Sequence, residues 1–95
     1  MTAESGVDGT IQPRLAPHVR LRLDERRQRW TIVAPERLLL PDDVALEVLR
    51  RCTGSISLAD IIADLARGFD APAEVIAGDV EALLRDMSDK GIVVW

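Results

Sequence analysis

The sequence of 95 residues contains little of what catalytic sites are usually built from: one cysteine, one histidine and no tyrosine. A catalytic Ser, Thr or Cys needs a neighbouring base, most often a histidine. His18 falls at a position that we expect to face solvent, and Cys52 continues an apolar helical stripe, so we interpret its thiol as part of the core. The sequence therefore predicts a protein that is not an enzyme.

Ligands for metals and cofactors are equally scarce. A zinc site usually takes about three or four ligands, mostly Cys and His, and this chain has one of each. No glycine-rich loop follows an expected strand, which argues against a nucleotide-binding loop. The acidic residues of the last expected helix are interpreted as a solvated surface: Asp79, Glu81, Asp86 and Asp89. We expect neither a metal nor a cofactor.

Long apolar runs are missing as well. No stretch approaches the roughly 20 apolar residues of a membrane span, and residues 1–18 lack the apolar centre of a signal peptide. A lone cysteine leaves no internal disulfide, which is usual in a reducing compartment. We therefore expect a cytoplasmic protein without membrane contact.

The N-terminal segment differs in composition from the rest. Residues 1–13 combine small and polar side chains without an apolar period, which predicts a disordered tail or linker. Residues 14–95 are expected to form one domain.

Charge divides that domain into two parts. Residues 14–51 carry nine arginines and six acidic residues, whereas residues 52–95 carry three basic and eight acidic residues. The arginines gather in the first expected hairpin, at Arg20, Arg22, Arg26, Arg27 and Arg29. They form either a solvated face or a docking patch for an acidic partner.

Hydrophobic alternation predicts three short strands in the first half. Residues 19–23 alternate between apolar and polar side chains, and residues 30–34 do so again. A polar turn over residues 24–29 joins the two segments as an antiparallel pair. Pro35 interrupts the ladder because it has no N–H to donate, and residues 36–40 follow as a short third strand.

Helical periodicity predicts three helices in the second half. The first begins at Pro41 and is stopped by Gly54, the second is capped by Ser57, and the third ends near Lys90. Their expected core residues are Ala45, Val48, Leu49 and Cys52, then Leu58, Ile61, Ile62, Leu65 and Phe69, then Ile76, Val80, Leu83, Leu84 and Met87.

The apolar residues 92–95 either pair as a strand or pack as a tail. The order of elements predicts an α+β fold of winged helix-turn-helix type, in which a three-stranded antiparallel sheet is followed by a three-helix bundle.

Winged helices often bind DNA, and that function requires basic side chains that contact phosphates. Both helices over residues 57–90 carry more acidic than basic side chains, so we expect no nucleic-acid partner. A winged-helix nucleic-acid-binding regulator remains the alternative function, and a subunit that recognises only a folded protein is a third.

Peptide capture is the interpretation that the third strand favours. The edge of a sheet presents unpaired N–H and C=O groups that another strand can use. Leu38, Leu39 and Leu40 are unusually apolar for a solvated edge. They either meet a peptide strand or pack under the first helix.

Short segments along the chain also resemble a known family. They are residues 15–21 (LAPHVRL), 34–37 (APER), 45–52 (ALEVLRRC) and 59–65 (ADIIADL), and Asp79 and Val80 with Leu83 and Leu84. Together they resemble the PqqD family, the peptide chaperone of pyrroloquinoline quinone (PQQ) biosynthesis. The family usually has Asp-Gly where this chain has Thr53 and Gly54, a difference at an expected helix stop.

The resemblance implies a recognition element for ribosomally synthesised and post-translationally modified peptides (RiPPs). Such an element holds the leader of a precursor peptide as an added strand and presents the precursor to a radical SAM enzyme, which crosslinks a Glu and a Tyr of the precursor. The implied peptide-binding residues are Glu36, Arg37, Leu38, Leu39 and Leu40 on the third strand, and Val75, Asp79, Ala82 and Leu83 on the third helix. We further predict that Arg26, Arg27 and Arg29 dock the enzyme.

Overall fold

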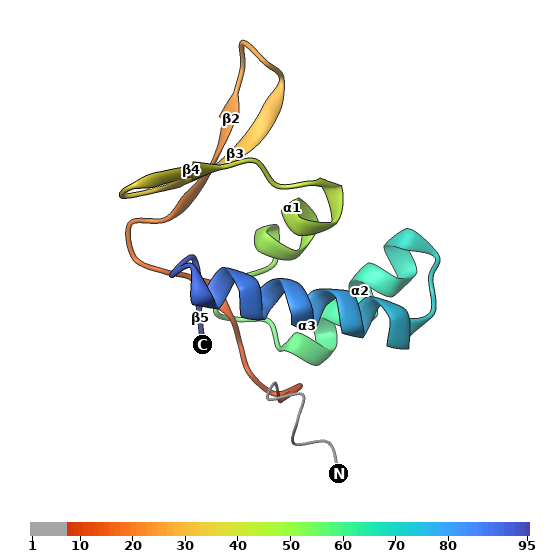
Figure 1. The fold of residues 1–95 in the computed structure, drawn as a ribbon. Coiled ribbons are helices and arrows are strands. Elements are labelled where there is room, and N and C mark those ends of the chain that lie inside the picture. The colour runs from red at the N-terminus through yellow and green to blue at the C-terminus, as the bar shows by residue number, and fades with distance from the viewer. Residues whose placement is uncertain (1–7) are drawn as a thin grey trace.

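The computed structural model describes residues 8–95, in which strands and helices follow the predicted order (Figure 1). The first strands are β1 (Arg14–Leu15), β2 (Arg20–Asp24), β3 (Arg29–Ala34) and β4 (Arg37–Leu39). The helices are α1 (Asp43–Arg50), α2 (Leu58–Phe69) and α3 (Ala73–Asp89), and a last short strand is β5 (Val93–Val94). The α+β class and the three-stranded antiparallel sheet followed by three helices are confirmed.

The main sheet has the strand order β2-β3-β4, with both pairings antiparallel. One face of the sheet turns toward the helices: Ile32 is fully buried there, and Leu21 and Leu39 pack against the same core. Arg20 and Arg22 lie on the other face because side chains alternate along a strand. The predicted alternation over residues 19–23 therefore holds near the start of β2.

The β2–β3 hairpin extends beyond the helices at its tip (Figure 1). Leu23, which we expected on the buried side, is 39% exposed for this reason. The turn itself is organised by Asp24, whose Oδ1 accepts the backbone N–H groups of Arg26 at 3.1 Å and Arg27 at 3.3 Å. Gln28 takes a positive φ of 55° to lead into β3.

Side-chain caps explain where two of the helices begin. The Oδ1 of Asp42 accepts the N–H of Ala45 at 2.8 Å, and the Oγ of Ser57 accepts the N–H of Asp60 at 3.1 Å. Each cap satisfies a donor that the first helical turn leaves without an intrahelical partner. The predicted cap at Ser57 is therefore confirmed.

Helix α1 is shorter than predicted, because it ends at Arg50 rather than near Gly54. Thr53 forms an isolated bridge to Arg14, and the N–H of Gly54 donates to the carbonyl of Pro13 at 2.9 Å. Gly54 has φ 85°, and a Cβ added there would lie 3.4 Å from the Cβ of Arg14. The glycine is thus required because the chain passes close to the start of β1 here, and it does not end the helix.

The core lies between the sheet and the three helices, and most predicted core residues are in it. Val48, Leu49, Cys52, Leu58, Ile61, Leu65, Ile76, Val80, Leu84 and Met87 are buried. Phe69 is the exception, since its side chain is 41% exposed in the last turn of α2, which ends at the left-handed Asp70. The prediction that Phe69 belongs to the core is wrong.

A second, two-stranded sheet joins the two ends of the domain. β1 pairs antiparallel with β5, with Arg14 opposite Val94 and Leu15 opposite Val93. The N–H of Ala16 also donates to the carbonyl of Ile92 at 2.8 Å. Of the two possibilities left open for residues 92–95, the strand is the one observed, and Ile92 and Val93 are fully buried.

The packed domain begins before the predicted boundary at residue 14. The carbonyls of Gly9 and Ile11 accept the N–H groups of Ala59 and Leu58 at 2.9 and 2.8 Å, and Pro13 is fully buried. These carbonyls satisfy donors of the first turn of α2, which is why this polar segment is ordered. The predicted tail is therefore wrong for residues 9–13, and residues 1–7 lie outside the described residues.

An ion-pair network connects the end of α1 to α2. Arg51 donates from Nε to Asp64 Oδ2 at 2.7 Å and from Nη1 to Glu47 Oε1 at 2.9 Å. The hydrogen bond and charge of Arg51 lower the pKa of Asp64 below its usual value, and the same carboxylates raise the pKa of Arg51. Asp64 therefore stabilises the fold in its ionised form.

We predict that Asp64→Asn lowers the thermal unfolding midpoint at pH 7. The folded protein holds the pKa of Asp64 below its unfolded value, so this stabilisation is present above the unfolded pKa of 3.8 and is lost as the pH falls through the folded value. Melting curves from pH 7 to pH 2 should show the difference between wild type and variant shrinking below pH 4. A difference that stays constant to pH 2, or that Glu25→Gln in the hairpin turn reproduces, would contradict this.

We also predict that the Cys52 thiol is inert in the folded protein. Burial raises its pKa from 9.0 to about 12, and its Sγ lies 3.3 Å from the carbonyl oxygen of Val48. The thiolate is the reactive form, so a pKa raised this far lowers its fraction by roughly a thousandfold at pH 8. Reaction with a disulfide reagent should be slow in buffer and complete within minutes in urea. Equally fast labelling of both states would refute the burial.

Candidate functional site

The main sheet ends in two strands with free edges, β2 and β4. In the β3–β4 hairpin, Ala34 faces Arg37 across a two-residue turn, so these two residues exchange both of their hydrogen bonds. Along an antiparallel ladder, hydrogen-bonded pairs of residues alternate with pairs that share no hydrogen bond. The next pair, Val33 and Leu38, is therefore not hydrogen-bonded, and the N–H and C=O of Leu38 point to the free edge of β4.

Alternation on β3 also fixes the direction of the groups on β2. Since Ile32 and Ala34 direct their backbone groups to β4, Thr31 and Val33 direct theirs to β2. Arg20 and Arg22 pair with these, so the N–H groups of Leu21 and Leu23 point to the free edge of β2. The two edges thus present their backbone at Leu38 on one side and at Leu23 on the other.

The side chains predicted on the third strand fall into three environments. Leu38 and Leu40 are 63% and 54% exposed, whereas Leu39 is half-buried and packs on the core. Arg37 is exposed at the start of β4, and Glu36 lies in the turn before it and not in the strand. Of the three leucines, only Leu39 packs inward, so the edge of β4 stays apolar and accessible.

The residues predicted on the third helix form a stripe along α3. Val75 is 54% exposed, Asp79 and Ala82 are exposed, and Leu83 is half-buried. Their spacing of about one and two helical turns places them on one side of the helix. Leu83 and Leu39 pack against the same core, so α3 and β4 border one hydrophobic cluster from two sides.

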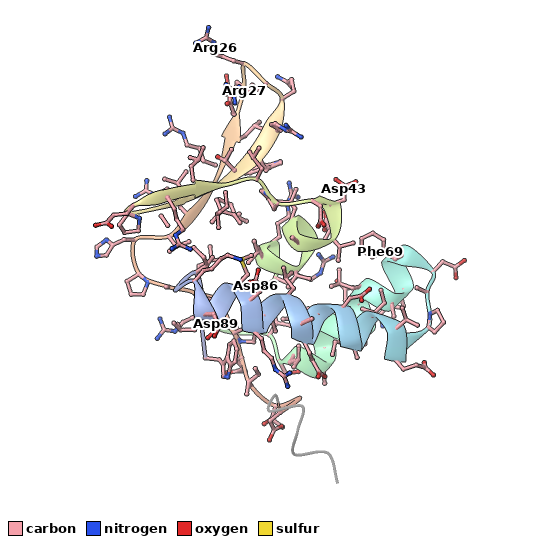
Figure 2. The ribbon with its side chains drawn as sticks, in the orientation of Figure 1. Arg26, Arg27, Asp43, Phe69, Asp86 and Asp89 are labelled. Carbon is pink, nitrogen blue, oxygen red and sulfur yellow. The ribbon has the colours of Figure 1, made fainter. Side chains whose placement is uncertain are left out.

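The predicted arginine patch is divided between two places. Arg26 and Arg27 lie at the tip of the hairpin, far from α3 (Figure 2). The Nε of Arg27 is 3.9 Å from Asp24 Oδ2, an exposed pair of small energetic value. Arg29 is the first residue of β3, and it lines a hollow beside α1 together with Arg27. Arg26 lines a different hollow, which it shares with Arg22.

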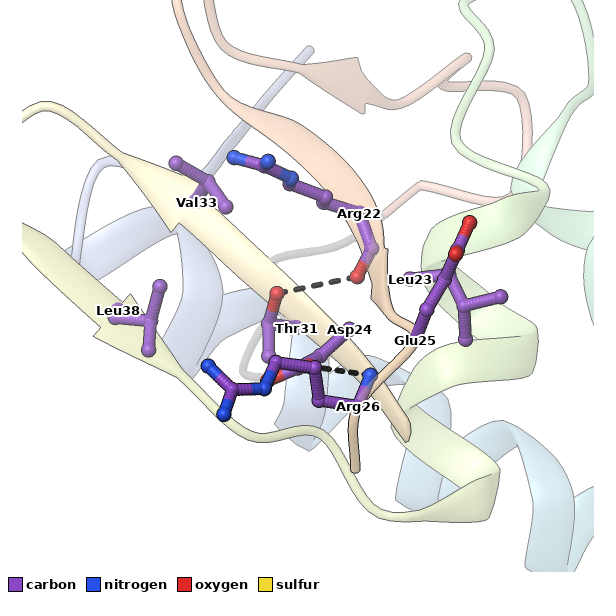
Figure 3. Close-up of a pocket in the computed structure, with 8 residues that line it drawn as sticks. All are labelled: Arg22, Leu23, Asp24, Glu25, Arg26, Thr31, Val33 and Leu38. Carbon is purple, nitrogen blue, oxygen red and sulfur yellow. Dashed lines mark hydrogen bonds between the residues drawn. The ribbon is translucent and has the colours of Figure 1, made fainter. Parts of the chain in front are cut away.

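Sequence reasoning missed a hollow on the face of the sheet that is turned away from the helices. Its lining includes Arg22, Thr31, Val33 and Leu38, and Figure 3 shows the Arg22 side chain extending along the sheet toward Val33. The hydroxyl of Thr31 donates to the carbonyl of Arg22 at 3.1 Å. The alternation on β2 contained the signal, because it places Arg20 and Arg22 on one face.

Residues 8–95 contain no group of three or more His, Cys, Asp or Glu side chains that could hold a metal ion. Among the helices in this part of the chain, none is both long and apolar enough to cross a membrane.

The arrangement offers an accessible apolar strand edge, and β4 and α3 pack against the same core through Leu39 and Leu83, which suits it to binding an extended chain. A family model described as "Coenzyme PQQ synthesis protein D (PqqD)" matches residues 29–93. The chain belongs to the PqqD family. The resemblance to this family is thereby confirmed.

Relatives in the PqqD family cover most of the chain. A protein of Rhodopseudomonas palustris strain HaA2 named "PqqA binding protein" is 50% identical over 82 residues, which are 86% of this chain and 80% of the relative. A protein of Xanthomonas euvesicatoria with the same name is 42% identical over 89 residues, or 94% of this chain and 97% of the relative.

Two solved PqqD structures resemble the fold. The solution structure of the PqqD truncation of Methylobacterium extorquens PqqCD, described as a functional and stand-alone RiPP recognition element, has a TM-score of 0.80 at 31% identity and covers 99% of this chain and 100% of that one. The crystal structure of PqqD from Xanthomonas campestris has a TM-score of 0.55 at 43% identity, covering 78% of this chain and 82% of that one.

Proposed function

We propose that this chain is a non-catalytic chaperone that binds the leader segment of the PqqA precursor peptide as an additional strand on β4. It then presents the precursor to the radical SAM enzyme of PQQ biosynthesis, which crosslinks a Glu and a Tyr of the peptide. The names of its relatives and the description of the Methylobacterium structure support peptide binding. The observation that carries the proposal is the outward N–H and C=O of Leu38 on an apolar edge.

The edge of β4 supplies backbone hydrogen bonds in a fixed register. Leu38 offers one donor and one acceptor at the free edge. Glu36 and Leu40 lie two residues away on either side, so the alternation of backbone groups extends the same edge to them. Each backbone hydrogen bond contributes about 1 kcal/mol net. A few of them bring the peptide to the micromolar range only if side chains are buried as well, because ordering an extended peptide opposes binding.

The side chains of an added strand would alternate between the two faces of the sheet. On the inner face they would approach Leu39. They would also approach Leu83 of α3, which packs against the same core as Leu39. Val75, Asp79 and Ala82 continue that side along the helix. We therefore assign these α3 residues as the second wall of the site, with Arg37 at the end where β4 begins.

Charge favours a peptide over the nucleic-acid alternative. The α3 helix exposes Asp79, Asp86 and Asp89, and the amine of Lys90 pairs with Asp86 at 2.6 Å. An acidic helix repels phosphates, on which nucleic-acid affinity mainly depends. In the same proposal the buried, inert Cys52 suits a reducing cytoplasm.

We predict that Leu38→Pro weakens binding of a synthetic precursor peptide by about tenfold or more, which corresponds to about 1.4 kcal/mol. Proline removes the outward N–H of β4 and places its ring where the peptide backbone must approach. Proline is tolerated at an edge position whose N–H faces solvent, so the variant should fold. Isothermal titration calorimetry gives the affinity, and circular dichroism checks the fold.

Two variants serve as controls. Leu23→Pro removes an outward N–H from the opposite edge of the sheet, at a leucine that is 39% exposed, and should bind the peptide like wild type. Leu38→Ala keeps the N–H and should lose less affinity than Leu38→Pro. A folded Leu38→Pro protein with wild-type affinity, or an equal loss in Leu23→Pro, would refute strand addition at β4.

A further inference from the structure

The face of the sheet that is turned away from the helices combines two arginines with the exposed Leu38 and the half-buried Val33. We call it the outer face and define it by Arg20, Arg22, Thr31, Val33 and Leu38. The strand register places Arg20 opposite Val33, Arg22 opposite Thr31, and Val33 opposite Leu38. Directly opposite residues of an antiparallel pair point to the same side of a sheet. The five side chains therefore form one continuous surface across the three strands.

This surface is hollowed and not flat. Two adjoining hollows share Arg22 and Val33, one extending toward Leu38 and the other toward His18 and Pro35. Figure 3 shows Leu38 and Val33 on neighbouring strands with the Arg22 side chain above β3. Leu38 is the most exposed large apolar side chain among the described residues, at 63%. An exposed apolar strip bordered by arginines has the composition of a protein–protein interface.

The two arginines have no acidic partner within residues 8–95. The ion pairs of this part of the chain involve Arg27, Arg51, Arg67 and Lys90 instead. Arg20 and Arg22 are exposed, and they sit on a protein with a net charge of −4. A guanidinium pairs well with a carboxylate through two parallel hydrogen bonds. The outer face is thus complementary to a surface that carries carboxylates.

The outer face is also continuous with the free edge of β4. A peptide strand added beside Leu38 would place every second side chain on this face, next to Leu38. The surface presented to a partner is therefore wider in the peptide-loaded protein than in the free one. A partner that contacts both would bind the loaded protein more tightly.

We propose that the outer face docks an acidic surface of the enzyme that modifies the peptide, and that the bound peptide strand forms part of the same docking surface. This inference rests on the proposed function. It assigns docking to Arg20 and Arg22, with Arg26 at the tip end of the same hollow, whereas Arg27 and Arg29 line the separate hollow beside α1. By linkage, peptide and enzyme must increase each other's affinity by the same factor.

The test compares two charge-matched double variants. The outer-face variant is Arg20→Gln with Arg22→Gln, and the tip variant, near the end of the hairpin and outside the outer face, is Arg27→Gln with Arg29→Gln. Surface plasmon resonance measures binding of the recombinant radical SAM enzyme at several salt concentrations, with and without saturating precursor peptide. Calorimetry measures peptide affinity separately. We expect the outer-face variant to lose about tenfold or more in enzyme affinity, with a weaker salt dependence, and to keep peptide affinity within about twofold. We expect the tip variant to change enzyme affinity by less than about threefold.

Several results would overturn the inference. Unchanged enzyme affinity in the outer-face variant, or an equal or larger loss in the tip variant, would move the docking surface elsewhere. Equal enzyme affinity with and without peptide would refute the shared surface. Binding of a random RNA through Arg20 and Arg22, without enzyme binding, would identify a different partner.

Failure of the proposed function gives a different pattern. If the wild-type protein binds no peptide, the strand-addition proposal fails, and enzyme binding that still depends on Arg20 and Arg22 would support the docking surface alone. If peptide binds and the enzyme does not distinguish the outer-face variant, the docking inference fails and peptide capture stands.

Discussion

The two-residue turn at Pro35 and Glu36 sets the register of β3 and β4, and the surface of this domain depends on that register. With Ala34 opposite Arg37, the alternation along β4 is determined. Leu39 turns to the core and Leu38 turns outward, with its backbone groups at the free edge. A shift of one residue would bury Leu38 and expose Leu39, because side chains alternate with a period of two. The register of β3 and β4 therefore determines the free edge at Leu38, the position of Leu38 on the outer face, and the contact of Leu39 with the core.

Charge follows the same division of the molecule. Five of the eleven arginines lie on the β2–β3 hairpin, and seven of the sixteen acidic residues lie on α2 and α3. The proposed peptide site lies between the two regions, since β4 borders the core from the sheet side and α3 borders it from the helix side. The proposed peptide edge and the proposed docking face adjoin at Leu38, which belongs to both. In the proposed function, this arrangement lets the domain bring the peptide and the enzyme together.

Much of the fold could be predicted because its signals are local. Alternation identified the strands, helical spacing identified the core stripes, and Ser57 marked the start of α2. The errors arose where contacts are distant in sequence. The carbonyls of Gly9 and Ile11 are held by the N–H groups of the first turn of α2. Gly54 is needed where the chain passes close to Arg14, and it does not end its own helix. Phe69 continues an apolar stripe, but nothing covers the last turn of α2 within the described residues.

The candidate site was predictable only in outline. The apolar run at residues 38–40 indicated an edge strand, yet periodicity could not show that Leu39 packs inward while its two neighbours remain exposed. Family resemblance supplied the pairing of this strand with the third helix. The outer face went unnoticed because it combines residues from three strands, and only the register brings Arg22, Val33 and Leu38 together.

The most direct test of peptide capture at β4 is an NMR titration of isotope-labelled protein with the synthetic precursor peptide. We expect the largest amide shifts on residues 36–40 and on the α3 side that carries Val75, Asp79, Ala82 and Leu83. The β2 edge at Leu21 and Leu23 should change little. Shifts centred on the β2 edge or on the α1–α2 side, or no shifts at high peptide concentration, would contradict peptide capture at β4.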